Sequence, residues 1–401
     1  MLPQDKTQLL TEHARALGFE LCGVAPAAGF HELKHFPEWL ARGYAGEMKY
    51  LHDPRRASPE NVLSGARSLI VCALNFNAPL PYSTDIAKKT TSKGDSKARS
   101  PRGWISRYAW GDDYHDVLGR KLDELLAWMR GEFGEEFRAK AYVDTGPVLE
   151  RVAAKYAGLG WLAKNTCLIN QRAGSWLFLG VILTDLEFAP SLAAPDQLPR
   201  DLCGNCRRCI DACPTGAIVE PYVLDARRCI AYLTIELRGS IPEEFRPAMG
   251  NMVFGCDICQ DVCPWNRKAP ATTLAEFMPR QIRAPLRDAS CQQTDAQEDA
   301  ARSDESLFHP SLEWLISLDE EEFRRIFRGS PVKRAKWRGL VRNACVALGN
   351  SRLEPESAER SRILGKLRKL AESEDEIIAE HARWALARLE SAAALPASQL
   401  D

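Results

Sequence analysis

The spacing of cysteines in one short segment constrains this chain more than any other feature of its sequence. Eight of the 13 cysteines in the 401 residues lie between Cys203 and Cys263. The segment begins with CGNCRRCIDACP, from Cys203 to Pro214, and this CxxCxxCxxxCP spacing is one that ligates [4Fe–4S] clusters. Three of its thiolates can surround one cubane, and the fourth then ligates a neighbouring cluster.

A shorter second motif brings the candidate ligands to eight. CDICQDVCP, from Cys256 to Pro264, repeats the Cys-Pro ending but lacks a leading cysteine, and Cys229 lies between the two motifs. Zinc sites are the alternative, because CxxC pairs also bind Zn²⁺, but the continuous first run and the repeated Cys-Pro ending favour clusters. We therefore predict two [4Fe–4S] clusters, one ligated by Cys203, Cys206, Cys209 and Cys263, and the other by Cys213, Cys229, Cys256 and Cys259.

The rest of the composition is that of an ordinary folded protein. Hydrophobic residues make up 45% of the chain and charged residues 27%, and the formal net charge of −1 indicates no particular partner. A disulfide scaffold would be short and would spread its cysteines along the chain. The longest apolar runs fall well short of the ~20 residues of a membrane helix, and the N-terminal sequence has no apolar signal-peptide core. We expect a cytoplasmic protein that does not bind membranes.

Hydrophobic periodicity divides the chain into parts. Up to residue 190, predicted strands alternate with predicted helices, which indicates an α/β domain. Residues 191–270 contain the cysteine motifs, and 271–310 are predicted to form a linker with an acidic stretch. Cys291 lies in this stretch and is not expected to ligate a cluster. The predicted strands are 19–24, 68–74, 139–143 and 176–184, and the predicted helices are 7–17, 116–130 and 148–158.

The last part of the chain, residues 311–401, is predicted to be helical almost throughout. Two of its amphipathic stretches, 336–350 and 377–389, lie about 40 residues apart and are typical of HEAT-type repeats. Residues 88–102 are polar, basic and poor in apolar residues, so we expect a surface loop there.

Three weaker motifs lie in the N-terminal part. Residues 158–163, GLGWLA, match the dinucleotide pattern GxGxxG/A, but they follow a predicted helix rather than a strand, so we predict a glycine helix stop. Residues 113–119 resemble a DxHxxG motif whose histidine coordinates cobalt in some cobalamin enzymes, but the glycine comes one residue late, and we predict a structural role for His115. Asp144 follows a predicted strand and is equally consistent with a helix N-cap or turn residue and with a catalytic acid.

The C-terminal helices carry an excess of positive charge. Between Arg324 and Leu370 there are 14 Lys and Arg residues and 3 Asp and Glu residues. A solvated helix face is the ordinary explanation, but so large an excess in a neutral protein indicates a phosphate-rich partner. Positions 334, 338 and 342 are four residues apart and are expected to share one helix face. The candidate contacts are Lys333, Arg334, Lys336, Arg338 and Arg342.

Taken together, these segments resemble epoxyqueuosine reductases, the cobalamin-dependent enzymes of queuosine formation in tRNA. The resemblance spans nearly the whole chain. The cysteine motif alone is shared with many ferredoxin-like proteins, whereas the combination is specific. It is carried by ISRYAWGDDYH at 105–115, DTGPVLER at 144–151, GLGWLAKNT at 158–166, both cysteine motifs, and RNACVALGN at 342–350.

The resemblance implies a fold and a reaction. The fold would be an α/β cobalamin-binding domain similar to that of reductive dehalogenases (1–190), a ferredoxin-like domain with two [4Fe–4S] clusters (191–270) and a HEAT-like helical tRNA-binding domain (311–401). The reaction would be the reduction of epoxyqueuosine to queuosine at the wobble position of tRNA anticodons, the last step of queuosine biosynthesis. Electrons from an external donor would pass through the clusters to cobalamin, and the family suggests a monomer.

The same resemblance assigns roles to residues. It implies that Asp144 lies beside the corrin and donates a proton to the departing epoxide oxygen. In this family the cobalt is not held by a protein histidine, which agrees with the incomplete DxHxxG motif. The residues expected to line the corrin pocket with Asp144 are Arg107, Tyr108, Lys164 and Asn165.

Two other functions fit parts of the sequence. A related cobalamin reductase acting on a small molecule, such as a dehalogenase, would commonly carry a twin-arginine export signal, which this chain lacks, and would not need a basic helical tail. A simple electron carrier would leave the N-terminal ~190 residues without a function. Retention of a corrinoid after reconstitution would distinguish the carrier from both enzymes.

Overall fold

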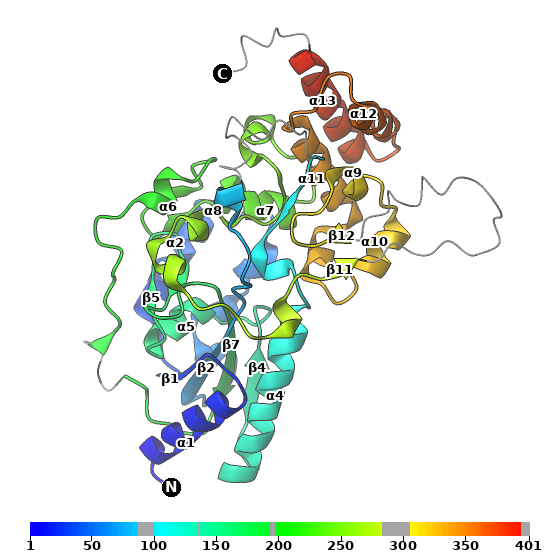
Figure 1. The fold of residues 1–401 in the computed structure, drawn as a ribbon. Coiled ribbons are helices and arrows are strands. Elements are labelled where there is room, and N and C mark those ends of the chain that lie inside the picture. Colours follow the sequence, from blue (N-terminus) through cyan, green and yellow to red (C-terminus); the bar gives the residue numbers. More distant parts are fainter. Residues whose placement is uncertain (87–99, 135, 193, 195–196, 283–304, 394–401) are drawn as a thin grey trace, which may run out of the picture. The chain divides into compact units, whose positions relative to one another are not determined.

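Figure 1 shows the computed structural model of the chain, which describes residues 1–86, 100–134, 136–192, 194, 197–282 and 305–393. The chain forms two compact units, each assembled from separated segments. The first unit comprises 1–87, 113–232 and 257–277, and the second comprises 88–112, 233–256 and 278–401. Within the range 191–270, residues 233–256 belong to the second unit, and the segments on either side, which carry most of the motif cysteines, belong to the first. Most of the loop expected at 88–102, and Cys291, lie outside the described residues.

The core of the first unit is a four-stranded sheet in the order β1-β2-β7-β4. All neighbouring strands are antiparallel, and Val71 faces Val181 in the central pair. The alternation of strands and helices along the chain thus builds an antiparallel sheet. The strands lie close to their predicted positions: β1 (Leu21–Pro26), β2 (Ser68–Asn75), β7 (Leu177–Thr184) and β4 (Ala139–Tyr142).

Helices cover both faces of this sheet. Alternate residues of a strand point to opposite faces, and Val71 packs with Val152 of α5. On the other face α4 lies close to β7, because a Cβ at Gly180 would stand only 2.8 Å from Leu122. The short apolar pattern at 139–143 is also typical of a buried strand, but β4 is an edge strand whose side chains are only partly buried. The long helices here are α1 (Pro3–Ala16) and α4 (Tyr114–Phe133), with the shorter α2 (Phe36–Ala41) and α5 (Glu150–Tyr156).

The helix stop predicted in the GLGWLA segment is confirmed. Helix α5 ends at Tyr156, and Gly158 follows with a φ of 79°. Gly160 allows a close approach of two backbones, because a Cβ there would lie 2.1 Å from the carbonyl oxygen of Ile169. These glycines therefore serve the turn between α5 and the hairpin of β5 (Trp161–Leu162) and β6 (Leu168–Ile169).

The cysteine motifs fold into short turns, helices and a small hairpin. In each motif a one-turn helix carries the residues that precede the Cys-Pro ending. These helices, α6 and α8, lie close together in the first unit. The elements are α6 (Arg208–Asp211), β8 (Ile218–Glu220), β9 (Val223–Leu224), α7 (Ile230–Ile235) and α8 (Ile258–Asp261).

The second unit is mainly helical, as predicted for the C-terminal part. Helix α13 packs against both α11 and α12. Two chain segments far from these helices join the unit, because β3 (Trp104–Ile105) pairs in parallel with β10 (Met252–Phe254). The remaining elements are β11 (Gln281–Ile282), β12 (Glu305–Ser306), α9 (Leu312–Leu315), α10 (Glu320–Ile326), α11 (Lys336–Gly349), α12 (Ala358–Ala371) and α13 (Glu376–Ala393).

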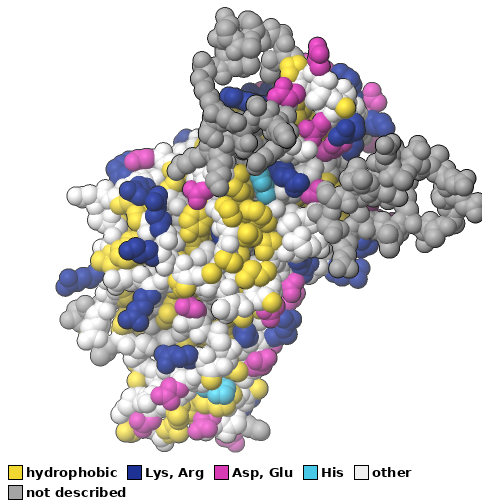
Figure 2. All heavy atoms as spheres, in the orientation of Figure 1, with side chains coloured by type: hydrophobic (Ala, Val, Ile, Leu, Met, Phe, Trp, Pro, Cys, Tyr) yellow, Lys and Arg dark blue, Asp and Glu magenta, His cyan; other side chains and the backbone are white. Residues whose placement is uncertain are grey.

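The surface carries charge of both signs. Figure 2 shows basic and acidic side chains interspersed over one face, in agreement with the net charge of −1. Among the described residues, no helix is both long enough and apolar enough to cross a membrane.

Candidate cluster and proton-donor sites

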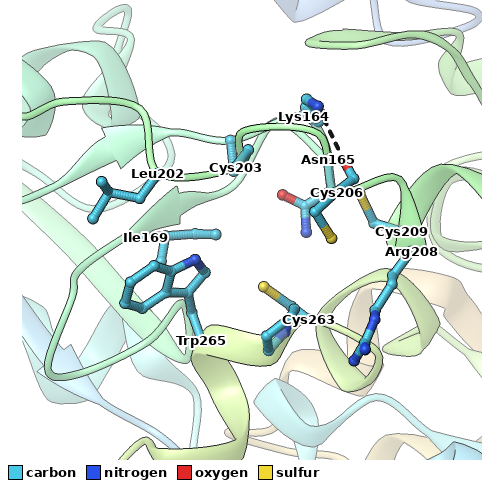
Figure 3. A pocket seen from close by; sticks show the side chains of 12 residues that line it. Lys164, Asn165, Ile169, Leu202, Cys203, Cys206, Arg208, Cys209, Cys263 and Trp265 are labelled. Atoms are coloured by element: carbon cyan, nitrogen blue, oxygen red, sulfur yellow. Dashed lines mark hydrogen bonds between the residues drawn. The ribbon is translucent and has the colours of Figure 1, made fainter.

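One pocket in the first unit brings together the four cysteines assigned to the first cluster. Cys203, Cys206, Cys209 and Cys263 line a cavity of about 250 Å³, although the last comes from the second motif. Figure 3 shows the thiols of Cys206 and Cys263 pointing into this space. The pocket is also lined by apolar side chains, which include Ile169, Leu202 and Trp265.

The protonation behaviour of these thiols fits a metal cluster. Burial raises the pKa of Cys263 to about 11, and burial also raises the pKa of Cys203 and Cys209. Four thiolate charges in such a pocket are costly unless cations neutralise them, and cluster iron supplies that charge. The donor set therefore fits a [4Fe–4S] cluster.

Lys164 and Asn165 hold the cysteine loops from the turn that follows β5. The Lys164 ammonium donates to the carbonyl oxygens of Gly204 and Cys206, the latter at 3.0 Å. The Asn165 amide donates to the carbonyl oxygen of Cys259 at 3.2 Å. Both side chains also line the cysteine pocket, so their polar groups are engaged with the cluster loops, a role that the sequence did not predict.

The second set of cysteines shares features with the first. The Cys213 sulfur accepts the N–H of Ala217 at 3.2 Å. Burial raises the pKa of Cys229, and the nearby Cys213 adds to this effect. Cys259 hydrogen-bonds with Cys167 and so lowers the pKa of the Cys167 thiol. Cys167 was not singled out from the sequence, because it stands alone, well before the first motif. Cys256 is the last residue of its second-unit segment, next to Asp257 of the first.

Asp144 lies in the loop between β4 and α5, with its carboxyl group facing outward. Its side chain is 64% exposed, and its backbone has a φ of 59°, in the left-handed region. The Tyr114 hydroxyl donates to Asp144 Oδ2 at 2.8 Å. The helix N-cap role considered for Asp144 is wrong, because Leu149 is the N-cap of α5 and has no side-chain cap.

Glu150, the first residue of α5, holds this loop from inside. The Asp144 N–H donates to Glu150 Oε1 at 2.7 Å. Burial, followed by the negative charge of Asp144, raises the pKa of Glu150 to about 8. Glu150 therefore carries a proton at neutral pH. Its side chain was missed because a glutamate in a first helical turn is ordinary in a sequence.

His115 lies beside Asp144 and is held from its other side. Asp113, the N-cap of α4, has its Oδ1 2.7 Å from His115 Nδ1. His115 Nε2 lies 3.9 Å from Asp144 Oδ2. Next to this group, the rings of Tyr114 and Phe178 stack at 4.4 Å. One ring nitrogen of His115 thus contacts the N-cap residue of α4, in line with a structural role, while the other faces the candidate acid.

Arg107 and Tyr108 belong to the second unit. Arg107 is 1% exposed, and its guanidinium lies 4.6 Å from the centre of the Trp110 ring. The Tyr108 ring lies 5.9 Å from that of Phe254 on β10.

The basic stripe predicted on the tail is wrong in two respects. Arg334 lies in the 3₁₀ turn Pro331–Ala335, and Lys336 has a φ of 63°, so the α11 helix does not extend back to Arg334. Arg342 is 1% exposed and donates to the carbonyl oxygens of Leu233, Leu237 and Gly239. The four-residue spacing of the basic residues could not show where helix α11 begins or which chain segment packs against it.

The other four candidate phosphate contacts are exposed. Arg334 pairs with Glu236 at 2.9 Å, and Arg338 pairs with Asp375. Lys333 and Lys336 are exposed as well.

Comparison with known proteins identifies the family. A family model described as epoxyqueuosine reductase QueG, DUF1730, matches residues 56–145. An epoxyqueuosine reductase from Pseudomonas aeruginosa is 38% identical over 389 residues, which cover 96% of this chain and 95% of the relative. The chain belongs to the epoxyqueuosine reductase family. The relative from Escherichia coli is 36% identical over 392 residues, covering 96% of this chain and 91% of that protein.

Solved structures of this family have the same fold. A crystal structure of an epoxyqueuosine reductase with an epoxyqueuosine-modified tRNA-Tyr stem loop matches with a TM-score of 0.76 and 29% identity, covering 96% of this chain and 90% of that chain. The enzyme from Bacillus subtilis, with its catalytic aspartate loop swung out of the active site, matches with a TM-score of 0.75 and 28% identity at the same coverage.

The comparisons also decide between iron–sulfur clusters and zinc. A model described as a 4Fe-4S double cluster binding domain matches residues 202–266. This range contains all seven cysteines of the two motifs and Cys229 between them. The prediction of two [4Fe–4S] clusters is confirmed, and the zinc alternative is wrong.

Proposed function

We propose that this protein reduces epoxyqueuosine to queuosine at the wobble position of tRNA, the last step of queuosine biosynthesis. The observation that carries the proposal is the exposed carboxyl of Asp144, which accepts the Tyr114 hydroxyl while Glu150 accepts the Asp144 backbone N–H, in a chain that also has a two-cluster segment. A relative of the same fold was crystallised with an epoxyqueuosine-modified tRNA stem loop, which supports this substrate.

The cofactors are the two [4Fe–4S] clusters and, in our proposal, cobalamin. The clusters deliver electrons one at a time, and cobalamin supplies a low-valent cobalt centre for cleavage of the epoxide. The carboxyl of Asp144 is exposed beside the rings of Tyr114 and Phe178, so a bound cofactor can reach it from solvent. Of the residues predicted to line the corrin pocket, Asp144 remains our candidate for corrin contact, because Arg107 is 1% exposed and the polar groups of Lys164 and Asn165 are engaged with the cluster loops.

The proposed role of Asp144 is to give a proton to the departing epoxide oxygen. General acids must lie within hydrogen-bond reach of the atom they protonate, and an exposed carboxyl on a loop can be brought to a substrate. The Tyr114 hydroxyl and the N–H bond to Glu150 orient this carboxyl. In the Bacillus subtilis enzyme a catalytic loop that contains an aspartate is swung out of the active site, which supports a catalytic role for the loop at Asp144.

The proposed tRNA surface lies on the C-terminal helices, which we interpret as HEAT-like. Lys333, Arg334, Lys336 and Arg338 are exposed and would contact phosphates, whereas buried Arg342 would not. We further propose that the protein is a cytoplasmic monomer that takes electrons from an external donor.

Asp144→Asn tests the assignment of the acid. We expect the variant to keep both clusters and to bind cobalamin, but to lose about 10²-fold or more in turnover of epoxyqueuosine-containing tRNA. Asp116→Asn is the matched control, because Asp116 is exposed in the first turn of α4. Turnover of Asp144→Asn within a few-fold of the control would refute the assignment.

A further inference from the structure

The reaction needs more protons than the single carboxyl of Asp144 can give. Loss of the epoxide oxygen as water consumes two electrons and two protons, and the electrons come from the external donor of the proposed function. After Asp144 has given its proton, the resulting carboxylate must be protonated again before it can act a second time. We propose that His115, oriented by Asp113, supplies that proton to Asp144. This inference rests on the proposed function, in which Asp144 is the acid.

Asp113 fixes the orientation of the imidazole. Its side chain is 2% exposed, and its Oδ1 accepts the backbone N–H of His115 at 3.1 Å while lying 2.7 Å from His115 Nδ1. A carboxylate can only accept a hydrogen bond, so Nδ1 carries the hydrogen in this contact. The other nitrogen, Nε2, is therefore the one that exchanges a proton with other groups.

Nε2 faces the oxygen that has to be protonated. It lies 3.9 Å from Asp144 Oδ2, the same oxygen that accepts the Tyr114 hydroxyl. The Asp144 side chain is 64% exposed, so it has room to move the roughly 1 Å by which this distance exceeds a hydrogen bond. The aromatic rings of Tyr114 and His115 stack at 4.1 Å, which keeps the imidazole in place while Asp144 moves.

The imidazole also has a route to solvent. The His115 side chain is 34% exposed, so it can take a proton from water or from a buffer acid. In the proposed sequence the O–H bond of Asp144 breaks as an O–H bond forms at the substrate oxygen. The N–H bond at Nε2 then breaks as Asp144 regains its proton, and His115 is finally protonated from solvent. The cap on α4 needs only the Asp113 carboxylate and a backbone N–H, so a purely structural account leaves the position of Nε2 unexplained.

The test is His115→Ala in the reconstituted holoenzyme, with tRNA that contains epoxyqueuosine. We expect the multiple-turnover rate to fall by about 10-fold or more, and added imidazole to restore it in a concentration-dependent way. His13→Ala is the control: His13 stacks on Trp128, which is 13 residues along α4 from His115 and so about 20 Å away. A rate equal to the control, or a loss that imidazole does not restore, would overturn the relay.

A second variant separates the relay from the fold. Asn is also a good N-cap residue, so Asp113→Asn should keep the melting temperature of the holoenzyme while lowering the multiple-turnover rate. An unchanged rate would overturn the role of Asp113. Failure of the proposed function gives a different result, because the wild-type holoenzyme would then not turn over this tRNA, whereas failure of the acid assignment would leave Asp144→Asn active. An inactive Asp144→Asn together with a fully active His115→Ala would reject only the relay.

Discussion

Replacing Glu150 with Gln should make the protein less sensitive to rising pH. The side chain of Glu150 accepts the Asp144 N–H, and burial, followed by the charge of Asp144, raises its pKa to about 8 from 4.5. Between these two values the folded protein holds a proton that the unfolded chain has released. The free energy of unfolding therefore falls as the pH rises through this window. Gln keeps the acceptor for the N–H but cannot ionise.

The expected size follows from the shift. Each pKa unit corresponds to 1.36 kcal/mol, so ionisation of Glu150 costs the wild type at most about 4 kcal/mol between pH 5 and pH 9. For a unit of this size, that is a difference in melting temperature of about 10 °C. The difference between Glu150→Gln and wild type should be small at pH 5 and should grow toward pH 9.

The assay is the melting temperature of the anaerobic holoprotein at several pH values. Glu124→Gln is the control, because Glu124 is an exposed glutamate on α4. Asp144→Asn should reduce the pH dependence of the wild type, since it removes the second cause of the shift. A Glu150→Gln curve that runs parallel to the wild-type curve from pH 5 to pH 9 would refute the reasoning.

Two further predictions concern the second cluster and the tail. Cys229→Ser should lower the iron content of the anaerobically reconstituted protein from about eight atoms per chain toward about four. Cys345→Ser, which changes a buried cysteine outside the motifs, should leave the iron content unchanged. Equal iron contents in the two variants would contradict the ligand assignment. The double variant Lys333→Ala/Lys336→Ala should flatten the salt dependence of tRNA binding by about one contact per charge removed, at an unchanged melting temperature. Arg342→Ala should instead destabilise the fold by about 3 kcal/mol, because it leaves buried carbonyl oxygens unpaired. A flattened salt dependence for Arg342→Ala with unchanged stability would contradict its buried role.

The features that could be predicted from sequence are those encoded by local spacing. Cysteine spacing reports ligand geometry directly, which is why the pocket of Cys203 and Cys263 agrees with the set predicted for the first cluster. Strand positions followed from short apolar runs. The position of Gly158 after a helical pattern was enough to predict the end of α5.

The features that were missed depend on contacts between distant segments. Arg342 is buried because segment 233–256 packs on α11. The residues around Arg342 do not indicate that this distant segment packs there. His115 and Glu150 meet Asp144 only after β4 and α4 are placed against β7. Their roles come from distances of a few ångströms, and these are set by the sheet.

The chain passes between its two units five times, from the first unit to the second at residues 87, 232 and 277 and back at 112 and 256. No single cut can therefore release either unit intact. Removing the helical tail would strip segments 88–112 and 233–256 of their partners, since the Gly103 N–H donates to Pro310 and the Asn343 amide donates to Thr234 and Val253. A tail deletion that abolishes tRNA binding would then report misfolding as readily as a lost contact surface. Point substitutions at exposed lysines are the experiment that this architecture permits.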